Sequence, residues 1–102
     1  MSLPPIDMHT THIYYNQLLI VGGRTHSEAQ GKTFSETIYA VHLLTGKVTV
    51  FDSLPTAFGA HVSFLVDNRY LVVCGGTDGF NILHWILRYD IKTSEWTKMV
   101  KF

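Results

Sequence analysis

Apolar residues along the chain occur in short runs, and polar or glycine-containing turns separate these runs. The two clearest runs, residues 18–21 and 70–74, each end at a pair of glycines. Short apolar or alternating runs bounded by turn residues predict β-strands, whereas helical periodicity with end caps is missing. The pattern therefore predicts an all-β chain. The eight expected strands cover residues 10–15, 18–21, 36–43, 47–51, 61–66, 70–74, 84–90 and 95–99.

One polar stretch, residues 24–35, interrupts this rhythm. It holds a single glycine, Gly31, and shows no apolar alternation. We therefore expect a long loop here, the only one in the chain. The corresponding stretch of the second half begins with residues 77–79, Thr-Asp-Gly, which favour a compact turn.

The two halves of the chain carry the same signals in the same order. Pro4 aligns with Pro55, the glycine pair at 22–23 with the pair at 75–76, and Thr45 with Thr93. The period is about 50 residues, which is typical of repeat proteins and propellers. A glycine pair at a strand end can adopt positive φ and lets another backbone approach closely.

The second half resembles a kelch repeat. An apolar run precedes the glycine pair at 75–76, Tyr89-Asp90 follows a second strand, and Trp96 comes six residues after Asp90. Tyr89 and Trp96 offer large apolar faces with a polar edge that can reach a neighbouring strand, so packing between sheets is their expected role. The residues assigned to the structural motif are Gly22, Gly23, Gly75, Gly76, Tyr89, Asp90 and Trp96.

The first half departs from the kelch pattern. Val41, His42 and Val48 stand where the second half has its tyrosine, aspartate and tryptophan. The resemblance still covers nearly the whole chain in two copies. It implies an all-β fold with two kelch-type blades of four antiparallel strands, residues 1–53 and 54–102, which are part of a β-propeller or assemble into one.

Two blades are fewer than the four to eight that usually close a propeller. A free pair would expose an apolar sheet face at each end, and neither half has the charge enrichment of a capping repeat. Three arrangements follow: the chain is a piece of a longer kelch protein, several copies form a ring, or the end faces pack on a different protein. We favour the first, because both ends of the sequence resemble cuts at repeat boundaries.

The kelch resemblance also implies a binding face. In kelch substrate adaptors of ubiquitin ligases, loops after the double glycine help to form the partner-binding surface, and Arg24 directly follows such a pair. An arginine there can bind a partner carboxylate through two hydrogen bonds; the alternative is that these are ordinary solvated loop residues. The candidate contacts are Arg24, Thr25, His26, Ser27, Phe58, Thr77, Asp78, Phe80 and Asn81, with Gly79, Asp7 and His9 beside them.

The composition excludes some partners. Lysine plus arginine is 8 and aspartate plus glutamate is 8, so no charge draws the chain to nucleic acid or an anionic membrane. No apolar run approaches the roughly 18 residues of a membrane helix. Cys74 is the only cysteine and lies in an apolar run, which predicts a buried small hydrophobe and no disulfide within the chain. We expect a reducing compartment, the cytoplasm.

Signals of metal or catalytic chemistry are thin. The six histidines are scattered, and His9 and His12 are three residues apart, which points them to opposite faces of a strand. No metal-binding spacing, nucleophile elbow or phosphate loop occurs, so we predict no metal, no cofactor and no catalytic residue. His42 and His84 are expected to make local hydrogen bonds in strands.

The function predicted from the sequence is a protein–protein interaction module that binds a partner protein or peptide through its inter-strand loops, one form of which is a substrate adaptor. Two alternatives remain open. The chain is a fragment of a carbohydrate-active kelch enzyme, of the sugar oxidase or sialic acid mutarotase type, or its blades are purely structural parts of a larger assembly.

Overall fold

The computed structural model of the chain describes residues 3–27 and 31–101. These residues form eleven β-strands and no helix, so the all-β prediction is confirmed. In this part of the chain there is accordingly no helix that could cross a membrane. The strands are β1 (Ile6–Asp7), β2 (Thr10–Tyr14), β3 (Gln17–Val21), β4 (Arg24–Ser27), β5 (Gly31–Phe34), β6 (Thr37–His42), β7 (Val48–Ser53), β8 (Val62–Val66), β9 (Tyr70–Cys74), β10 (Trp85–Asp90) and β11 (Glu95–Lys101).

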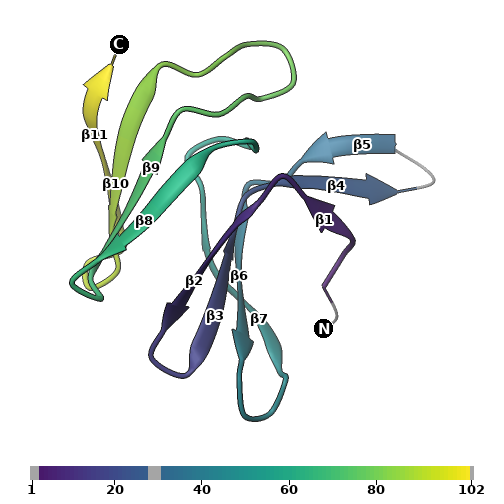
Figure 1. Cartoon of the computed structure of the whole chain (residues 1–102), viewed down its shortest axis with the longest axis vertical. Coiled ribbons are helices and arrows are strands. Elements are labelled where there is room, and N and C mark those ends of the chain that lie inside the picture. Colours follow the sequence, from purple (N-terminus) through teal and green to yellow (C-terminus); the bar gives the residue numbers. More distant parts are fainter. Residues whose placement is uncertain (1–2, 28–30, 102) are drawn as a thin grey trace.

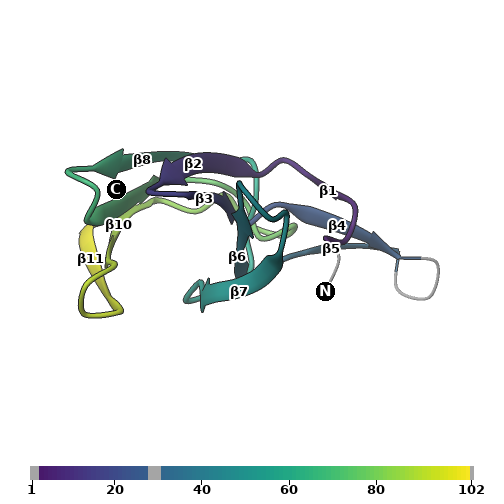
Figure 2. The ribbon, with the colours of Figure 1, turned by 90° about the horizontal axis from the view of Figure 1, so that it is seen from below.

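The strands form three antiparallel sheets (Figure 1). We call the four-stranded sheet β2-β3-β6-β7 blade 1 and the four-stranded sheet β8-β9-β10-β11 blade 2. In Figure 2 the two blades stand side by side, with β2 and β8 along one edge of the pair and β7 and β11 along the other. The predicted pair of four-stranded antiparallel sheets is confirmed. The division between residues 53 and 54 falls in the connection from β7 to β8, and as a domain boundary it stays a prediction.

The third sheet, β1-β4-β5, corrects the expectation of a long loop over residues 24–35. β4 and β5 form a hairpin in which Thr25 pairs with Thr33, and the Thr25 hydroxyl donates to the Thr33 carbonyl at 3.1 Å. β1 adds to the other edge of β4. The hairpin carries mostly polar side chains on both faces, so it lacks the apolar alternation by which strands are recognised in a sequence.

The two blades match each other in register. Val21 and Cys74 end β3 and β9 directly before the glycine pairs, and they pair with Ile38 and Ile86 of the next strand. An irregularity in the ladder to the outermost strand follows both isoleucines. The register therefore makes these residues equivalent: Thr10 and Val62, His12 and Phe64, Val41 and Tyr89, His42 and Asp90, Val48 and Trp96, Asp52 and Val100.

The hydrophobic core lies between the blades. Side chains alternate along each strand, so one face of blade 1, its forward face, meets the opposite face of blade 2, its rear face. The connection between the blades closes the core with Leu54 and Phe58. The buried core residues of the sheets are Leu19, Val21, Ile38 and Ala40 on the forward face of blade 1, and Leu71, Val73, Leu87 and Tyr89 on the rear face of blade 2.

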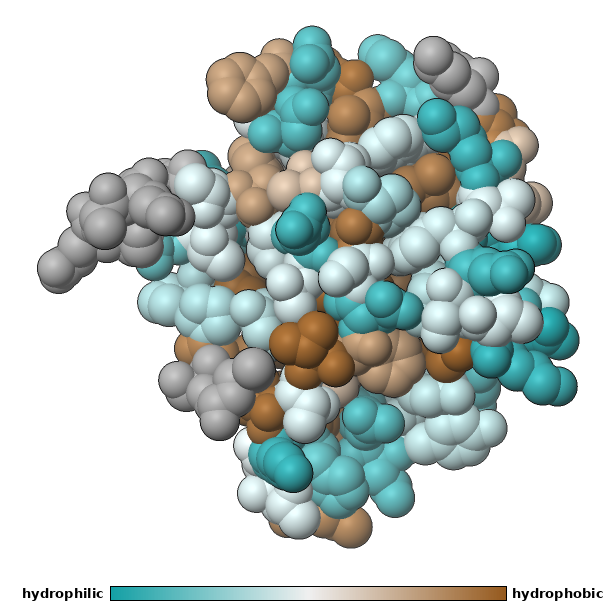
Figure 3. All heavy atoms as spheres, turned by 180° about the vertical axis from the view of Figure 1, so that it is seen from behind, coloured by the Kyte–Doolittle hydropathy of each residue, from teal (hydrophilic) through white to brown (hydrophobic). Residues whose placement is uncertain are grey.

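The outer faces of the pair are uncovered. On the forward face of blade 2, Val62 and Phe64 are 55% and 53% exposed. On the rear face of blade 1, Ile13 and Val50 are 65% and 52% exposed. The expected apolar sheet face is thus present at each end. On the side shown in Figure 3, by contrast, apolar residues lie as separate patches among polar ones.

The glycine pairs bring separate segments into contact. Gly23 and Gly76 have φ values of 101° and 105°, a region that favours glycine. A Cβ on Gly23 would lie 2.7 Å from the carbonyl oxygen of Asp7, and one on Gly76 would lie 2.9 Å from that of Gly59. The positive φ and the close backbone approach expected from the sequence are therefore both observed.

Candidate functional site

Loops from both blades meet beside the β4–β5 hairpin and leave a groove of about 390 Å³ between them. Contributions come from β5, from the connection between the blades and from the loop after β9. Loops on a rigid sheet scaffold are the usual carriers of recognition. We call this feature the loop groove, and it is lined by Thr33, Phe34, Ala57, Asp78, Gly79 and Phe80.

Phe34 is the residue through which the parts of the loop groove meet. A Cβ added to Gly59 would lie 2.8 Å from Cε1 of the Phe34 ring, and one added to Gly79 would lie 3.2 Å from Cε2. Glycine at both positions therefore allows the ring to lie close against the connection of one side and the loop of the other. The half-buried ring supplies an apolar wall to the groove.

The loop of residues 77–82 is held by its own hydrogen bonds. The Asp78 carboxylate accepts the backbone N–H groups of Phe80 at 2.9 Å and Asn81 at 2.8 Å. The Thr77 hydroxyl donates to the Asn81 carbonyl at 2.9 Å, and Thr77 pairs with Gly59 through two backbone hydrogen bonds. This frame presents the side chain of Phe80 to solvent, where it is 94% exposed.

The charge of Asp78 is stabilised by the same loop. The backbone N–H of Asn81, followed by that of Phe80, lowers the pKa of Asp78 below its ordinary value. A carboxylate that accepts backbone N–H groups is favoured in its ionised form. The loop groove therefore combines an apolar wall with a negative charge at its lip.

Arg24 is bound within the chain. Its Nε donates to Oδ1 of Asp7 at 3.0 Å and its Nη2 donates to Oδ2 at 2.8 Å, in the two-bond geometry that arginine forms with a carboxylate. The hydrogen bonds from Arg24 lower the pKa of Asp7 to about 2. The expected arrangement thus exists, but with an internal carboxylate, and a contact of Arg24 with a partner stays a prediction.

The other predicted residues of this stretch follow Arg24 along β4. The Thr25 hydroxyl bonds to Thr33, and Nε2 of His26 lies 3.4 Å from Oδ2 of Asp7. Ser27 ends the strand. Neither Thr25 nor His26 lines the loop groove, although both lie in the sheet that supplies its β5 wall. Their contact with a partner also stays a prediction.

Phe58 corrects one site prediction. Its side chain is fully buried, with ring centroids 5.0 Å from His61 and 6.1 Å from Trp85. Its carbonyl accepts the N–H of Gly23 at 2.9 Å. The prediction that Phe58 contacts a partner is wrong, because the connection between the blades folds this ring into the core instead of presenting it in an exposed loop.

Three residues that line the loop groove were not predicted from the sequence as partner contacts: Thr33, Phe34 and Ala57. The first two lie in the stretch that was expected to be a loop. Phe34 is the only aromatic residue between the first glycine pair and residue 38, and a lone aromatic in a polar stretch was the available signal.

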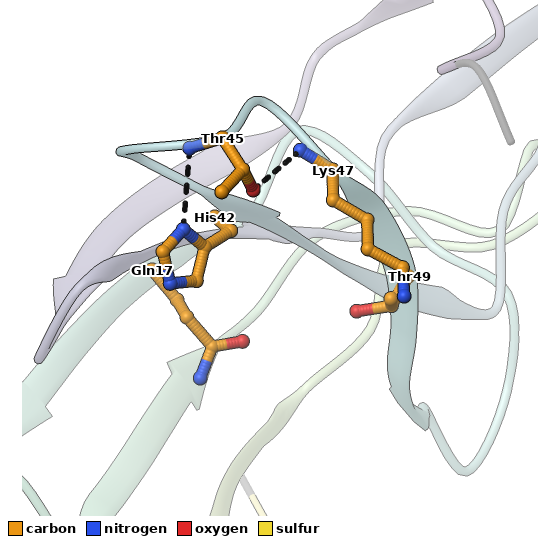
Figure 4. A pocket seen from close by; sticks show the side chains of 5 residues that line it. All are labelled: Gln17, His42, Thr45, Lys47 and Thr49. Carbon is orange, nitrogen blue, oxygen red and sulfur yellow. Dashed lines mark hydrogen bonds between the residues drawn. The ribbon is translucent and has the colours of Figure 1, made fainter.

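A second hollow of about 330 Å³ lies at the opposite end of blade 1, near its turns (Figure 4). Gln17 and His42 lie together on one side, and Lys47 and Thr49 on the other. The Nδ1 atom of His42 accepts backbone N–H groups in the turn, including that of Thr45 at 3.3 Å. This confirms the local hydrogen bonding expected for His42. The hollow is lined by blade 1 alone, whereas the loop groove joins segments of both halves.

A polar seam, formed by Thr10, His12, His61 and Ser63, joins the edge strand β2 to β8 and the residue before it. The Thr10 hydroxyl lies 2.8 Å from Nε2 of His61 and 2.5 Å from Oγ of Ser63, and Nε2 of His12 lies 2.6 Å from the same Oγ. With His61 neutral and accepting at Nε2, the donors run in one direction, from His12 to Ser63 to Thr10 to His61.

Burial controls the charge of the seam. Burial, followed by the charges of His9 and His12, lowers the pKa of His61 to about 4, against a backbone hydrogen bond with Val21 that raises it. Burial also lowers the pKa of His12. His9 precedes β2, so the prediction that His9 and His12 point to opposite faces of one strand stays a prediction.

The seam is not arranged as a metal centre. Within residues 3–27 and 31–101, no group of three or more His, Cys, Asp and Glu side chains is placed to hold a metal ion.

The motif aromatics act between the blades. Tyr89 is buried and its hydroxyl donates to the Asp52 carboxylate of blade 1, while Nε1 of Trp96 donates to the Ser53 carbonyl at 3.0 Å. Their rings lie 4.8 Å apart. Burial, then the hydrogen bond to Asp52, raises the pKa of Tyr89 to about 12. The packing role expected for both residues, with a polar edge reaching a neighbouring strand, is confirmed.

The arrangement of the two blades is similar to that of known proteins. A family model described as "Kelch motif" matches residues 59–102. A solved structure titled "Structure of YjhT" has the same arrangement over 96% of this chain and 39% of its own, with a TM-score of 0.80. The sequences are 14% identical, so this likeness concerns the fold, and the chain spans well under half of that structure. No curated protein matches the chain.

Proposed function

The chain belongs to the kelch-repeat β-propeller family, and from this premise we propose that it binds a protein partner through the loop groove. The observation that carries the proposal is the placement of Phe80. Its side chain is 94% exposed on a loop that several hydrogen bonds hold in place, beside the apolar wall of Phe34. Exposed aromatic side chains on ordered loops are typical anchors of protein recognition.

The chemistry of the groove selects a kind of ligand. Phe34, Ala57 and Phe80 offer apolar surface, and Asp78 places a stable negative charge at the lip. A peptide segment with an aromatic or branched apolar side chain next to a lysine or arginine fits this combination. The volume of about 390 Å³ holds one or two side chains, not a folded domain, so the recognised element is a short segment.

Selection from a random peptide library on the immobilised chain tests the proposal. We expect enriched sequences with an apolar residue beside a basic one. Phe80→Ala should weaken binding of an enriched peptide by about tenfold or more, since loss of a central aromatic anchor costs more than 1 kcal/mol. Titration calorimetry or fluorescence anisotropy measures the change.

A matched control lies at the far end of the molecule. Leu44 is 82% exposed in the turn between β6 and β7, and Leu44→Ala should leave the affinity unchanged. Peptides that bind wild type and Phe80→Ala equally well would contradict the proposal. So would a library in which no sequence is enriched over a counter-selection against Phe80→Ala.

The enzymatic alternative has less support. No observation in the described part of the chain favours a carbohydrate-active site of the sugar oxidase or sialic acid mutarotase type. The purely structural alternative is the outcome in which the peptide selection fails.

A further inference from the structure

The junction between the blades is built from pairs of side chains that lie on opposite faces. On the forward face of blade 1, Asp52 accepts the Tyr89 hydroxyl from the rear face of blade 2. Thr10 and His12 of the forward face bond in the same way to Ser63 of the rear face. At these contacts each blade supplies the hydrogen-bond partner for a polar group of the other, as buried polar groups require.

At the uncovered ends of the molecule one of these pairs, Asp52 with Tyr89, is replaced on both sides together. The equivalent of Asp52 on the forward face of blade 2 is Val100, and the equivalent of Tyr89 on the rear face of blade 1 is Val41. Replacing only one member would leave a carboxylate or a hydroxyl without a partner in a buried contact. Valine against valine avoids that cost.

Along the edge strand only the forward face changes, because Thr11 keeps a hydroxyl on the rear face of blade 1 at the position of Ser63. Val62 and Phe64 stand on the forward face of blade 2 where blade 1 has Thr10 and His12. Val62, Phe64 and Val100 are between 46% and 55% exposed on this face, and Arg88 and Thr97 lie on it as well. The rear face of blade 1 also carries apolar residues: Ile13 and Val50 are exposed and Val41 is half-buried.

We propose that these two uncovered faces bind each other in a second copy of the chain, head to tail. The forward face of blade 2 in one copy receives the rear face of blade 1 in the next, in the geometry that the internal junction already shows. Such a contact joins two different surfaces and closes into a ring when the rotations complete a turn. Two, three or four copies give the four to eight blades of closed propellers.

The contact between the two blades within one chain indicates what covers the outer faces. The forward face of blade 1 already accepts a rear face, and the two blades share strand order, register and the irregularity after Ile38 and Ile86. A second copy brings the rear face of a blade with the same strand order and register, and its Val41 matches Val100. The proposal is independent of the loop groove, because none of the groove residues lies on either face.

Native mass of the purified 102-residue chain gives the first test. We expect two, three or four times 11.6 kDa by light scattering. Val100→Asp should reduce the mass to 11.6 kDa, because it sets a carboxylate against Val41 without a partner. Adding Val41→Tyr to this variant should restore the larger mass, because it recreates the Tyr89–Asp52 pair across the new contact.

Two further variants keep the result interpretable. Phe64→Asp changes a more exposed position of the same face and should also give the single-chain mass, while circular dichroism checks that the strands persist. Leu44→Asp, at an exposed turn residue, should leave the assembly intact. A wild-type chain that stays at 11.6 kDa up to its solubility limit would overturn the proposal and favour further blades of a longer chain on these faces.

Cross-linking separates head-to-tail contact from a symmetric dimer. In a Cys74→Ala background, one chain carries Val41→Cys and another carries Val100→Cys, and a short bis-maleimide is added. We expect cross-linked pairs only in the mixture of the two. Cross-linking of either variant with itself would indicate like faces in contact and overturn the head-to-tail arrangement, as would no cross-linking in any sample.

Discussion

Blade 1 and blade 2 share their strand order and register, yet they differ at the positions by which a kelch repeat is recognised. In blade 2, Tyr89 and Trp96 reach Asp52 and the Ser53 carbonyl of blade 1. In blade 1, valines occupy both equivalent positions, on a face that no blade covers. This difference indicates that Tyr89 and Trp96 stabilise the contact with the preceding blade. They are not needed to form the four-stranded sheet itself.

The third motif position shows the opposite behaviour. In blade 2 the Asp90 carboxylate accepts the N–H of Lys92 at 3.0 Å and fixes the turn before β11. In blade 1, Nδ1 of His42 accepts the N–H groups of Leu44 and Thr45, each at 3.3 Å. The function of this position lies within the blade, so blade 1 keeps it with a different side chain. This confirms the turn role expected for Asp90.

The largest expected effect comes from removing the junction aromatic. Tyr89→Ala should lower the free energy of unfolding by about 3–5 kcal/mol, because it empties a fully packed site and leaves Asp52 without its donor. Val41→Ala, at the equivalent position of blade 1, should cost only about 1 kcal/mol. Urea unfolding followed by tryptophan fluorescence measures both. Equal losses for the two variants would break the distinction between the faces.

The polar seam belongs to the same junction and predicts a pH dependence. His61 binds a proton in the unfolded chain with a pKa of about 6.5 but in the folded chain with a pKa of about 4. The unfolded state thus binds more protons between these values, so the stability is fully present above about pH 6.5 and falls on acidification. The expected loss between pH 6.5 and 4 is about 2–3 kcal/mol.

Variants separate this histidine from other acid effects. His61→Gln should flatten the stability profile over that window, measured by urea midpoints at successive pH values. Leu44→Ala changes an exposed residue that does not titrate and should keep the wild-type slope. A slope that survives in His61→Gln would assign the acid sensitivity to carboxylates elsewhere.

The sequence was informative where local chemistry determines the structure. The glycine pairs require positive φ, and the apolar runs before them form strands whatever the surroundings, so both blades could be predicted. The β4–β5 hairpin could not, since it is stabilised by backbone pairing and by Asp7, which is distant in sequence. The prediction that Phe58 contacts a partner was wrong for a related reason. Its ring is buried only because the two blades pack against each other around it.

The loop groove, too, could be predicted from the sequence only in part. Asp78 and Phe80 belong to a compact turn that the sequence indicated, and they were predicted as contacts. Phe34 and Ala57 join them only because glycines at 59 and 79 let the ring approach. Such convergence of distant segments leaves no local pattern in a sequence read without relatives.

The smallest expected effect concerns the position that both blades retain. His42→Asp gives blade 1 the turn acceptor of blade 2, and should raise the free energy of unfolding by a few tenths of a kcal/mol, about the scale of a better turn residue. The reciprocal Asp90→His should destabilise the chain, because it also removes the hydrogen bonds that Arg69 donates to Asp90 at 3.2 and 3.0 Å. The asymmetry follows from the arginine, which blade 1 lacks at the equivalent position, where Asn16 stands. If both exchanges were neutral by urea midpoint, the turn acceptor would not be the reason why this position carries a polar side chain in each blade.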